Sequence, residues 1–228
     1  MGHCRCPPNW LSPAGKKNWR FAAGKSRRLL EGINGFMTDA LQTTLRDLAT
    51  WLRSESIPFA VIGGIAASVR GEPRFTADVD LVVGIDVDQA LLLSERLPTS
   101  PFRPLFDGIA EVIQTAFLMP IRHVVTTIPA DIAIGLSGFE LQAISRATLT
   151  AMGDFQVPVV TAEDLILMKL LASRPRDLED IDRIVMRHRQ SLDWTYLIET
   201  GQQLQEAVAQ DLVPALEALR SGKLRSGS

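Results

Sequence analysis

The first clear hydrophobic pattern in the chain begins near residue 38. Leu41, Leu45 and Leu48 recur at spacings of three to four residues, and Trp51 and Leu52 continue the series. This period places the apolar side chains on one stripe of a helix. The pattern therefore predicts an amphipathic helix that ends at about residue 54.

Shorter apolar runs follow, bounded by proline and glycine. Residues 59–63 ("FAVIG") and residues 77–83 ("ADVDLVV") have the length and β-branched content of strands. A short helix at residues 65–69 lies between them, and residues 87–97 ("VDQALLLSERL") have a helical pattern. The predicted order so far is strand, helix, strand, helix.

The second half of the chain changes from strands to helices. Residues 100–130 contain four prolines and weak alternation, which predicts irregular structure with some strand, and residues 130–136 ("ADIAIGL") predict another strand. Beyond residue 160 the pattern is helical, with Thr161 as the N-cap of the first helix and Asp164 three residues later. The predicted helices cover residues 161–173, 178–189 and 196–220.

Taken together, the elements predict an α/β (α+β) fold with a mixed sheet flanked by helices and a helical C-terminal subdomain. We expect a core domain at residues 37–160 and the helical subdomain at residues 161–228. Residues 1–36 contain several prolines and glycines without a sustained period, and they predict a disordered basic tail.

Composition adds limits on the class of protein. The chain has 228 residues, of which 46% are hydrophobic and 22% charged, as in ordinary globular proteins. No run of about 18 apolar residues is present, so we expect no membrane span. Cys4 and Cys6 are too close together for a disulfide framework, which favours a reducing, cytoplasmic location.

Charge is distributed unevenly along the chain. Residues 1–36 hold seven Lys or Arg and one acid, so the remainder has 24 − 7 = 17 basic and 26 − 1 = 25 acidic residues, a net charge of −8. An acidic body argues against a protein whose main task is to bind long nucleic acid. It does not exclude a small or locally bound RNA.

Two carboxylates lie in the predicted strand at residues 77–83. Successive side chains of a strand alternate between its faces, so Asp78 and Asp80 should point the same way, about 6.5–7 Å apart at Cα. Two such charges repel each other unless a cation compensates them. Mg²⁺ or Mn²⁺ is a suitable cation for hard oxygen ligands and completes its shell with water and phosphates. The alternative without a functional role is a pair of solvated or turn-capping aspartates.

A glycine pair precedes these carboxylates. Gly63 and Gly64 end one strand and begin a helix, where missing Cβ atoms let the backbone approach a ligand and free N–H groups can bind an anion. Alone, the pair can equally make a tight turn. Combined with the carboxylates, it predicts a site for a metal ion and phosphates.

The glycine pair and the aspartates together resemble the signature of a known family. The stretch "VIGGIAASVRGEPRFTADVDLVV" (residues 61–83) is similar to the signature of the nucleotidyltransferase superfamily with the polymerase-β-like fold. The variant here resembles small bacterial nucleotidyltransferases, including abortive-infection toxins. The resemblance continues to residue 185 and includes Asp131, in the position of a third carboxylate on a neighbouring strand.

The resemblance implies transfer of a nucleoside monophosphate (NMP) from a nucleoside triphosphate (NTP) to a hydroxyl acceptor, with release of pyrophosphate. Asp78 and Asp80 would ligate two metal ions, and Asp131 would bind the ion nearest the acceptor and help to remove the hydroxyl proton. Gly63 and Gly64 would hold the β and γ phosphates. The acceptor, which could be RNA or tRNA, protein or a small molecule, and the base of the NTP stay open.

Three further residues are candidates for nucleotide binding. Arg74 and Thr76 precede the predicted metal strand and could reach phosphate oxygens. Lys169 lies on an apolar helix, and its ammonium either points toward the triphosphate or reaches past the core to water. The charged run that contains Asp177, Asp180 and the arginines around them predicts a salt-bridged face rather than a second metal site. His123 is more typical of a structural residue than of a catalyst.

Three hypotheses about the function are consistent with the sequence. The leading hypothesis is an active, metal-dependent nucleotidyltransferase that is the toxin of a toxin–antitoxin or phage-defence system, with a cognate antitoxin protein as partner. The alternative is a non-catalytic, NTP-binding regulatory or antitoxin-like protein, but such a binder does not need three mutually repelling acids. An antibiotic-modifying enzyme with the same reaction is the third hypothesis.

Overall fold

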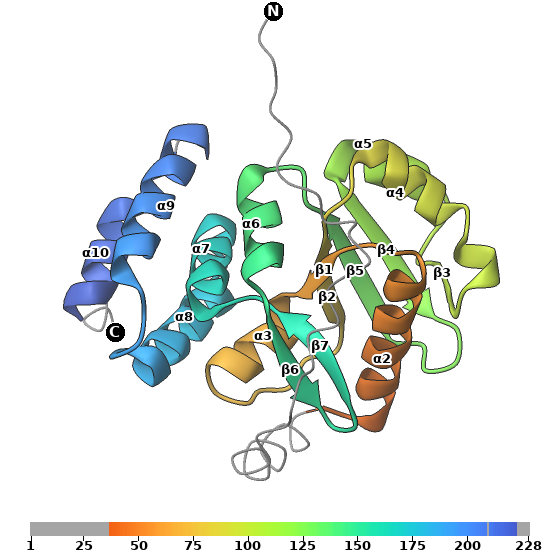
Figure 1. The fold of residues 1–228 in the computed structure, drawn as a ribbon, viewed down its shortest axis with the longest axis horizontal. Helices are drawn as coiled ribbons and strands as arrows, with labels where there is room; N and C mark the ends of the chain where they lie inside the picture. Colours follow the sequence, from red (N-terminus) through yellow and green to blue (C-terminus); the bar gives the residue numbers. More distant parts are fainter. Residues whose placement is uncertain (1–36, 209, 223–228) are drawn as a thin grey trace, which may run out of the picture.

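In the computed structural model, residues 37–208 and 210–222 are described. Predictions for residues 1–36, including the basic tail and the two cysteines, lie outside these ranges. Within them, one mixed sheet is flanked by helices, as expected (Figure 1). The strands are β1 (Phe59–Val61), β2 (Val79–Val83), β3 (Phe102–Pro104), β4 (Leu118–His123), β5 (Pro129–Ile134), β6 (Thr148–Met152) and β7 (Phe155–Val159).

The helices before the last strand pair are interspersed with the strands, and four more follow them. The first group is α2 (Asp39–Ser54), α3 (Gly63–Arg70), α4 (Val87–Ser94), the short 3₁₀ helix η1 (Leu97–Thr99), α5 (Ile109–Ala116) and α6 (Gly138–Arg146). The second group is α7 (Ala162–Ala172), α8 (Pro175–His188), α9 (Trp194–Val208) and α10 (Val213–Ser221). In Figure 1 this second group lies beyond β6 and β7, on the side away from β3 and β4.

The sheet has the strand order β3-β4-β5-β2-β1-β7-β6. The central strand β2 pairs antiparallel with β1 and parallel with β5. In the parallel pair, Asp80 is opposite Asp131 and Val82 is opposite Ala133. Because these positions alternate with Leu81 and Val83, the two rungs lie on one face of the sheet.

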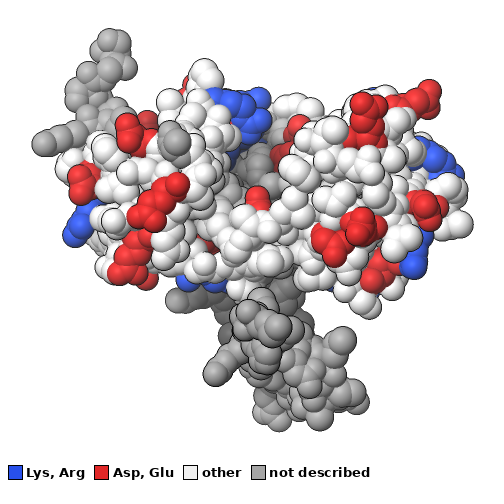
Figure 2. All heavy atoms as spheres, turned by 90° about the horizontal axis from the view of Figure 1, so that it is seen from above, with Lys and Arg blue, Asp and Glu red and all other residues white. Residues whose placement is uncertain are grey.

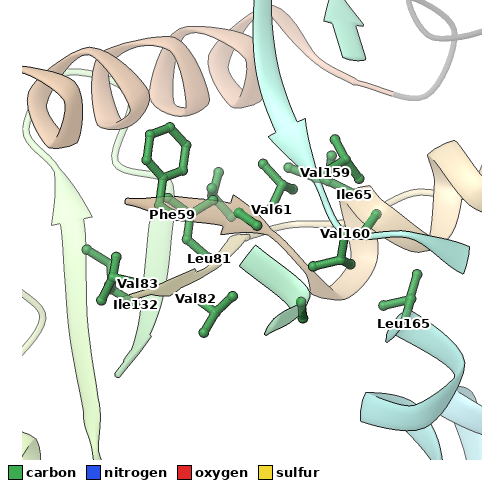
Figure 3. Close-up of a cluster of buried hydrophobic side chains, with 14 of the residues drawn as sticks. Phe59, Val61, Ile65, Leu81, Val82, Val83, Ile132, Val159, Val160 and Leu165 are labelled. Atoms are coloured by element: carbon green, nitrogen blue, oxygen red, sulfur yellow. The ribbon is translucent and has the colours of Figure 1, made fainter. Parts of the chain in front are cut away.

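The two faces of the central strands carry different helices. Phe59 points toward α2, and the Arg53 guanidinium of that helix lies 5.7 Å from the centre of the Phe59 ring (Figure 3). Val82 points to the opposite face (Figure 3). The segment around Gly135, which leads into α6, lies against Val82. The carboxylate rung therefore shares its face with α6.

The first predicted helix is confirmed. α2 begins after Thr38, whose side-chain oxygen accepts a hydrogen bond from the Leu41 N–H, and its apolar stripe is buried. Removing an N-cap of this kind typically costs about 1 kcal/mol. Thr161 is also an N-cap, as predicted, because its side chain accepts from the Asp164 N–H at the start of α7.

Two segments differ from the sequence prediction. Residues 100–130 contain the regular elements β3, α5 and β4 rather than mainly irregular structure. Residues 196–220, which were predicted as one helix, form two helices, α9 and α10. The helical conformation is interrupted before Val213, and Pro214 occupies the first turn of α10. Proline fits a first turn, where the N–H would have no helical partner.

His123 is a structural residue in this fold, as the sequence analysis expected. Its ring is buried, and its Nδ1 accepts hydrogen bonds from the Val125 and Thr126 N–H groups. That leaves Nε2 to donate to the Asp47 carboxylate at 3.0 Å. The ring therefore ties the β4–β5 turn to α2. Among the described helices, none is long and apolar enough to cross a membrane.

Candidate active site

The predicted site residues lie around one cavity of about 650 Å³. The cavity extends over the sheet face that carries Asp80 and Asp131 and reaches α3, α6 and α7. Every residue proposed from the sequence lines it: Gly63, Gly64, Arg74, Thr76, Asp78, Asp80, Asp131 and Lys169. The fold thus gathers residues that are up to 106 positions apart.

Asp80 and Asp131 are brought together by strand pairing. They are register partners in the parallel pair of β2 and β5, so their side chains leave neighbouring strands on the same face. Both are partly buried. The spacing of two carboxylates on adjacent strands is therefore fixed by backbone hydrogen bonds rather than by flexible loops.

The electrostatics of the site show uncompensated negative charge. Burial, and then the charge of Asp78, raise the pKa of the Asp80 carboxyl from 3.8 to about 6. Burial and the Asp78 charge also raise the pKa of the Asp131 carboxyl. Because Asp78 acts on both of the others, the three acids form one repelling group.

Asp78 corrects one detail of the sequence analysis. It lies in a bend directly before β2, which begins at Val79, and not inside the strand. Its Oδ1 accepts a hydrogen bond from the Thr76 hydroxyl at 2.8 Å. Thr76 is therefore in contact with a carboxylate of the site, and the structure shows it orienting Asp78.

Gly63 and Gly64 are the first two residues of α3, at the edge of the cavity, so the helix begins two residues earlier than predicted. The Gly64 N–H donates to Asp80 Oδ2 at 3.3 Å. Gly63 has a φ of +60°, a conformation that favours glycine, and a Cβ built on it would lie 1.9 Å from Asp80 Oδ2. The pair lets the helix terminus approach the carboxylate.

Exchange of Gly63 for Ala should therefore displace the Asp80 carboxylate and reduce NMP transfer by about a hundredfold, since a misplacement of 1 Å in an active site can have that effect. Gly108→Ala is the matched control. Gly108 also has a positive φ, of +81°, but nothing lies within 4 Å of its missing Cβ. Transfer rates of both variants should be compared at equal folded concentration. Equal losses would show that backbone strain, and not the contact with Asp80, is responsible.

Lys169 points into the cavity wall and not to water. Only 4% of the residue is exposed, and its Nζ lies 2.7 Å from Asp177 Oδ1 and 2.8 Å from Asp180 Oδ2. Arg74 forms two hydrogen bonds with the Asp180 carboxylate, at 2.7 and 2.8 Å. Lys169, Arg74 and Asp180 thus connect α7, the loop before β2 and α8.

The salt-bridged face predicted for residues 174–183 is present, but two of its acids are not at the surface. Asp177 and Asp180 are buried, whereas Glu179 and Arg183 form an exposed pair as expected. Burial acts to raise the pKa of both aspartates, but hydrogen bonds from Lys169 and from an arginine outweigh it and lower both values. We call Arg74, Asp180, Lys169, Asp177 and Arg174 the charge ladder.

Arg174 is a residue of the site that the sequence analysis did not single out. Its Nε lies 2.6 Å from Asp177 Oδ2, and it lines the cavity with its side chain mostly exposed. The hydrogen bond with Asp177 and the charge of that carboxylate, and after them the charges of Asp80 and Asp78, raise the pKa of the Arg174 guanidinium. It is a cation close to the carboxylates that can also reach a ligand. Its position directly after α7 and before Pro175 was the available signal.

Figure 2 shows how charge is distributed on one face of the molecule. Asp and Glu atoms are scattered on both sides of a hollow, while Lys and Arg atoms gather at a wall of that hollow and at a few places on the margin. This face does not carry the continuous basic surface that long nucleic acid requires.

The carboxylates fit a divalent cation by their chemistry. In the described part of the chain, no group of three or more His, Cys, Asp or Glu side chains is already arranged as a metal-binding cluster. One oxygen each of Asp78 and Asp80 accepts a local hydrogen bond. However, these are hard oxygen donors with unbalanced charge, and Mg²⁺ is usually held by one or two carboxylates together with water and substrate phosphates.

Comparison with known protein families gives one match over most of the chain. The family model described as "Nucleotidyl transferase AbiEii toxin, Type IV TA system" matches residues 46–221. The match includes every residue of the candidate site. No curated protein matches the chain significantly in sequence.

Several solved structures resemble the chain in fold at low identity. An antigenic nucleotidyltransferase-like protein from Paracoccidioides brasiliensis is 21% identical, with 80% of this chain and 94% of that one covered and a TM-score of 0.47. The lincosamide antibiotic adenylyltransferase LnuA, bound to lincomycin, is 14% identical, with 65% and 96% covered and a TM-score of 0.45. A CCA-adding enzyme in complex with ATP is 13% identical, with 83% and 49% covered and a TM-score of 0.38.

Proposed function

Because this chain belongs to the AbiEii family of nucleotidyl transferase toxins from type IV toxin–antitoxin systems, we propose that it transfers an NMP from an NTP to an acceptor hydroxyl in a reaction that depends on divalent metal ions. The enzyme class, a nucleotidyltransferase, follows from the family. The observation that supports the metal-dependent reaction is the pairing of Asp80 with Asp131 in the same cavity as Asp78 and the N-terminus of α3.

The three carboxylates have different parts in this proposal. Asp78 and Asp80 would hold two Mg²⁺ or Mn²⁺ ions, and Asp131 would hold the one nearest the acceptor. The bound ions would neutralise the charge of the attacking and leaving oxygens. Asp131 would also help to remove the proton of the acceptor hydroxyl, which lies next to the ion that it would bind.

The reaction is a single displacement at the α-phosphorus. The acceptor oxygen forms a bond to the α-phosphorus, the bond to the bridging oxygen of the β-phosphate breaks, and pyrophosphate leaves. The N–H groups of Gly63 and Gly64 hold the β and γ phosphates at the start of α3. Arg74, Thr76 and Lys169 complete the nucleotide site, and Arg74 and Lys169 supply positive charge there.

The charge ladder holds the basic side chains of the site in place before the substrate binds. Arg74, Lys169 and Arg174 carry three positive charges against the two negative charges of Asp177 and Asp180. The group keeps a net charge of +1 beside the cavity. Triphosphate oxygens can therefore be attracted without leaving an unpaired cation in the free enzyme.

In the biological setting, the chain would be the toxin of a toxin–antitoxin or phage-defence pair, with an antitoxin protein as cognate partner. The acceptor would be an RNA, a protein or a small molecule. To test this, the purified full-length chain is incubated with each labelled NTP, Mg²⁺ or Mn²⁺, total RNA and cell lysate. The products are then fractionated to determine which fraction carries the label.

Label in one fraction, dependent on the divalent ion, is the expected result. If no NTP is consumed with either ion and any acceptor, the proposal is wrong, and binding of NTP without turnover would favour the regulatory alternative. Label only in a small-molecule fraction, with drug resistance in cells, would point to an antibiotic acceptor instead of a macromolecule.

A further inference from the structure

The cavity has an apolar half that the proposed chemistry does not use. Val82 and Ala133 form the next rung of the β2–β5 pair on the carboxylate face, two residues beyond Asp80 and Asp131. This places the apolar rung about 6.5–7 Å from the carboxylates along the strand. The sugar of a nucleotide separates its phosphate from its base by a similar length.

Two helices close this half of the cavity. Phe139 of α6 and Met168 of α7 both line it, and Phe139 is 9% exposed. A Cβ built on Gly135 would lie 3.1 Å from Glu140 Cβ and 3.3 Å from Val82 Cγ2, so the start of α6 lies directly over the apolar rung. We call the space between Val82, Ala133, Phe139 and Met168 the apolar slot. Its apolar walls, with the ring of Phe139 among them, suit an aromatic ring.

Glu140 is the acidic side chain at the α6 end of the slot. It lines the cavity and belongs to the capping box of α6, in which its Oε2 accepts from the Ser137 N–H at 2.8 Å while its own N–H donates to the Ser137 hydroxyl. Among the hydrogen bonds of the described residues, Oε1 takes part in none. The cap holds the carboxylate through Oε2, and Oε1 is therefore available as an acceptor beside the slot.

From this geometry we propose that the apolar slot holds the base of the incoming NTP and that Glu140 recognises the hydrogen-bonding edge of that base. The inference rests on the proposed NMP transfer and specifies its nucleotide. Glu140 is then a specificity-determining residue, which favours bases that carry an exocyclic amino group over uracil.

The preference follows from donors and acceptors. Adenine, cytosine and guanine present an amino group that can donate to a carboxylate oxygen. Uracil presents a ring N–H between two carbonyl oxygens, and these oxygens repel an ionised carboxylate. A hydrogen bond to a charged group is stronger than a neutral one. The difference between a good and a poor partner for a charged acceptor is worth about tenfold or more in affinity.

The decisive variant is Glu140→Gln. Glutamine also serves in a capping box, and this chain already uses Gln89 at the same position of α4, where Asp86 is the cap. The exchange should therefore keep the helix start while it replaces the charged acceptor with a neutral amide that can also donate. The dissociation constants of the α,β-methylene analogues of all four NTPs are measured with Mg²⁺, since these analogues cannot release pyrophosphate.

For the unaltered chain, we expect the UTP analogue to bind about tenfold more weakly than the best amino-bearing analogue. In Glu140→Gln this ratio should fall close to one. Gln89→Glu, the reverse exchange in the cap of α4, should leave the ratio unchanged. Phe139→Leu should weaken all four analogues, by about tenfold, because it removes ring stacking but no edge contact.

The inference is wrong if the unaltered chain binds all four analogues equally, or if Glu140→Gln leaves an existing preference unchanged. It is also wrong if Glu140→Gln and Phe139→Leu alter only the KM of the acceptor, because the slot then holds the acceptor. If Glu140→Gln does not fold, purine riboside triphosphate, which lacks the amino group of ATP, replaces it as the test on the unaltered chain. It should bind about tenfold more weakly than ATP.

Failure of this inference can be distinguished from failure of the proposed function. Base selectivity is measured by binding alone, so it can be present in a chain that transfers no NMP. Conversely, a chain that transfers NMP but ignores the base would refute only the role of Glu140.

Discussion

Exchange of Asp80 for Asn should lower the rate of NMP transfer about a thousandfold and leave the fold intact. Asparagine has the same shape, and its carbonyl oxygen can still accept the hydrogen bond from the Gly64 N–H. What is lost is a negative charge for a divalent ion, whose stabilisation of the transition state is worth several kcal/mol, with each 1.36 kcal/mol equal to a tenfold change in rate. Single-turnover transfer of labelled NMP measures the loss.

The stability of the same variant separates a chemical from a structural effect. The pKa of Asp80 in the folded protein, about 6, exceeds the ordinary aspartate value of 3.8, so the ionised carboxylate destabilises the free protein as the pH rises from about 4 through 6. Asp80→Asn should therefore be at least as stable as the unaltered chain toward urea at pH 7.5. Asp154→Asn, on an exposed pair with Arg46, is the control for both measurements. Transfer by Asp80→Asn within about threefold of this control would refute the assignment.

The residues that share this cavity could be proposed from the sequence because they follow local rules. A glycine pair at a strand–helix junction, and acids alternating with buried apolar residues, each have a short-range cause that a sequence displays. Asp131 was found by its apolar neighbours and by family resemblance. Its pairing with Asp80 depends on which strands are neighbours in the sheet, and that is decided by long-range packing.

The sequence predicted the ion pairs of α8 but not the burial of Asp177 and Asp180, for a physical reason. Alternating acids and bases on a helix are usually solvated, yet Asp177 and Asp180 share the stripe of α8 that also buries Ile181 and Ile184. Their spacing of three, one and three residues could have revealed two acids on an apolar stripe. The cations that make their burial possible come from other elements, Arg74 from 106 residues away. Charge alone did not show which acids face inward.

The irregular appearance of residues 100–130 had a different cause. Pro104 and Pro120 lie in strands that the structure forms, in β3 at the edge of the sheet and in β4 beside it. Proline usually argues against a strand because it cannot donate a ladder hydrogen bond. α5, whose cap is Gly108 in a left-handed conformation, begins without the side-chain N-cap that would announce a helix.

Removal of the Asp180 carboxylate should destabilise the protein by about 3–5 kcal/mol, the usual effect of taking one partner from a buried ion pair. Asp180 is 2% exposed and holds both Arg74 and Lys169. Without it, Arg74 loses its ion pair, and Lys169 shares the carboxylate of Asp177 with Arg174. In the Asp180→Ala variant, the midpoint of urea unfolding should fall without a change in the dependence on denaturant.

Glu179→Ala, the neighbouring position, is the matched control. Its side chain is 66% exposed and lies 3.6 Å from Arg183, so its loss should change the free energy of unfolding by less than about 1 kcal/mol. Equal effects of the two variants would show that the charge ladder does not hold α8 against α7. If the charge ladder does hold α8 against α7, the folded Asp180→Ala variant should also bind NTP more weakly. Arg74 precedes Thr76 and Asp78 in the loop that leads into β2, so a displaced Arg74 would also displace these two residues.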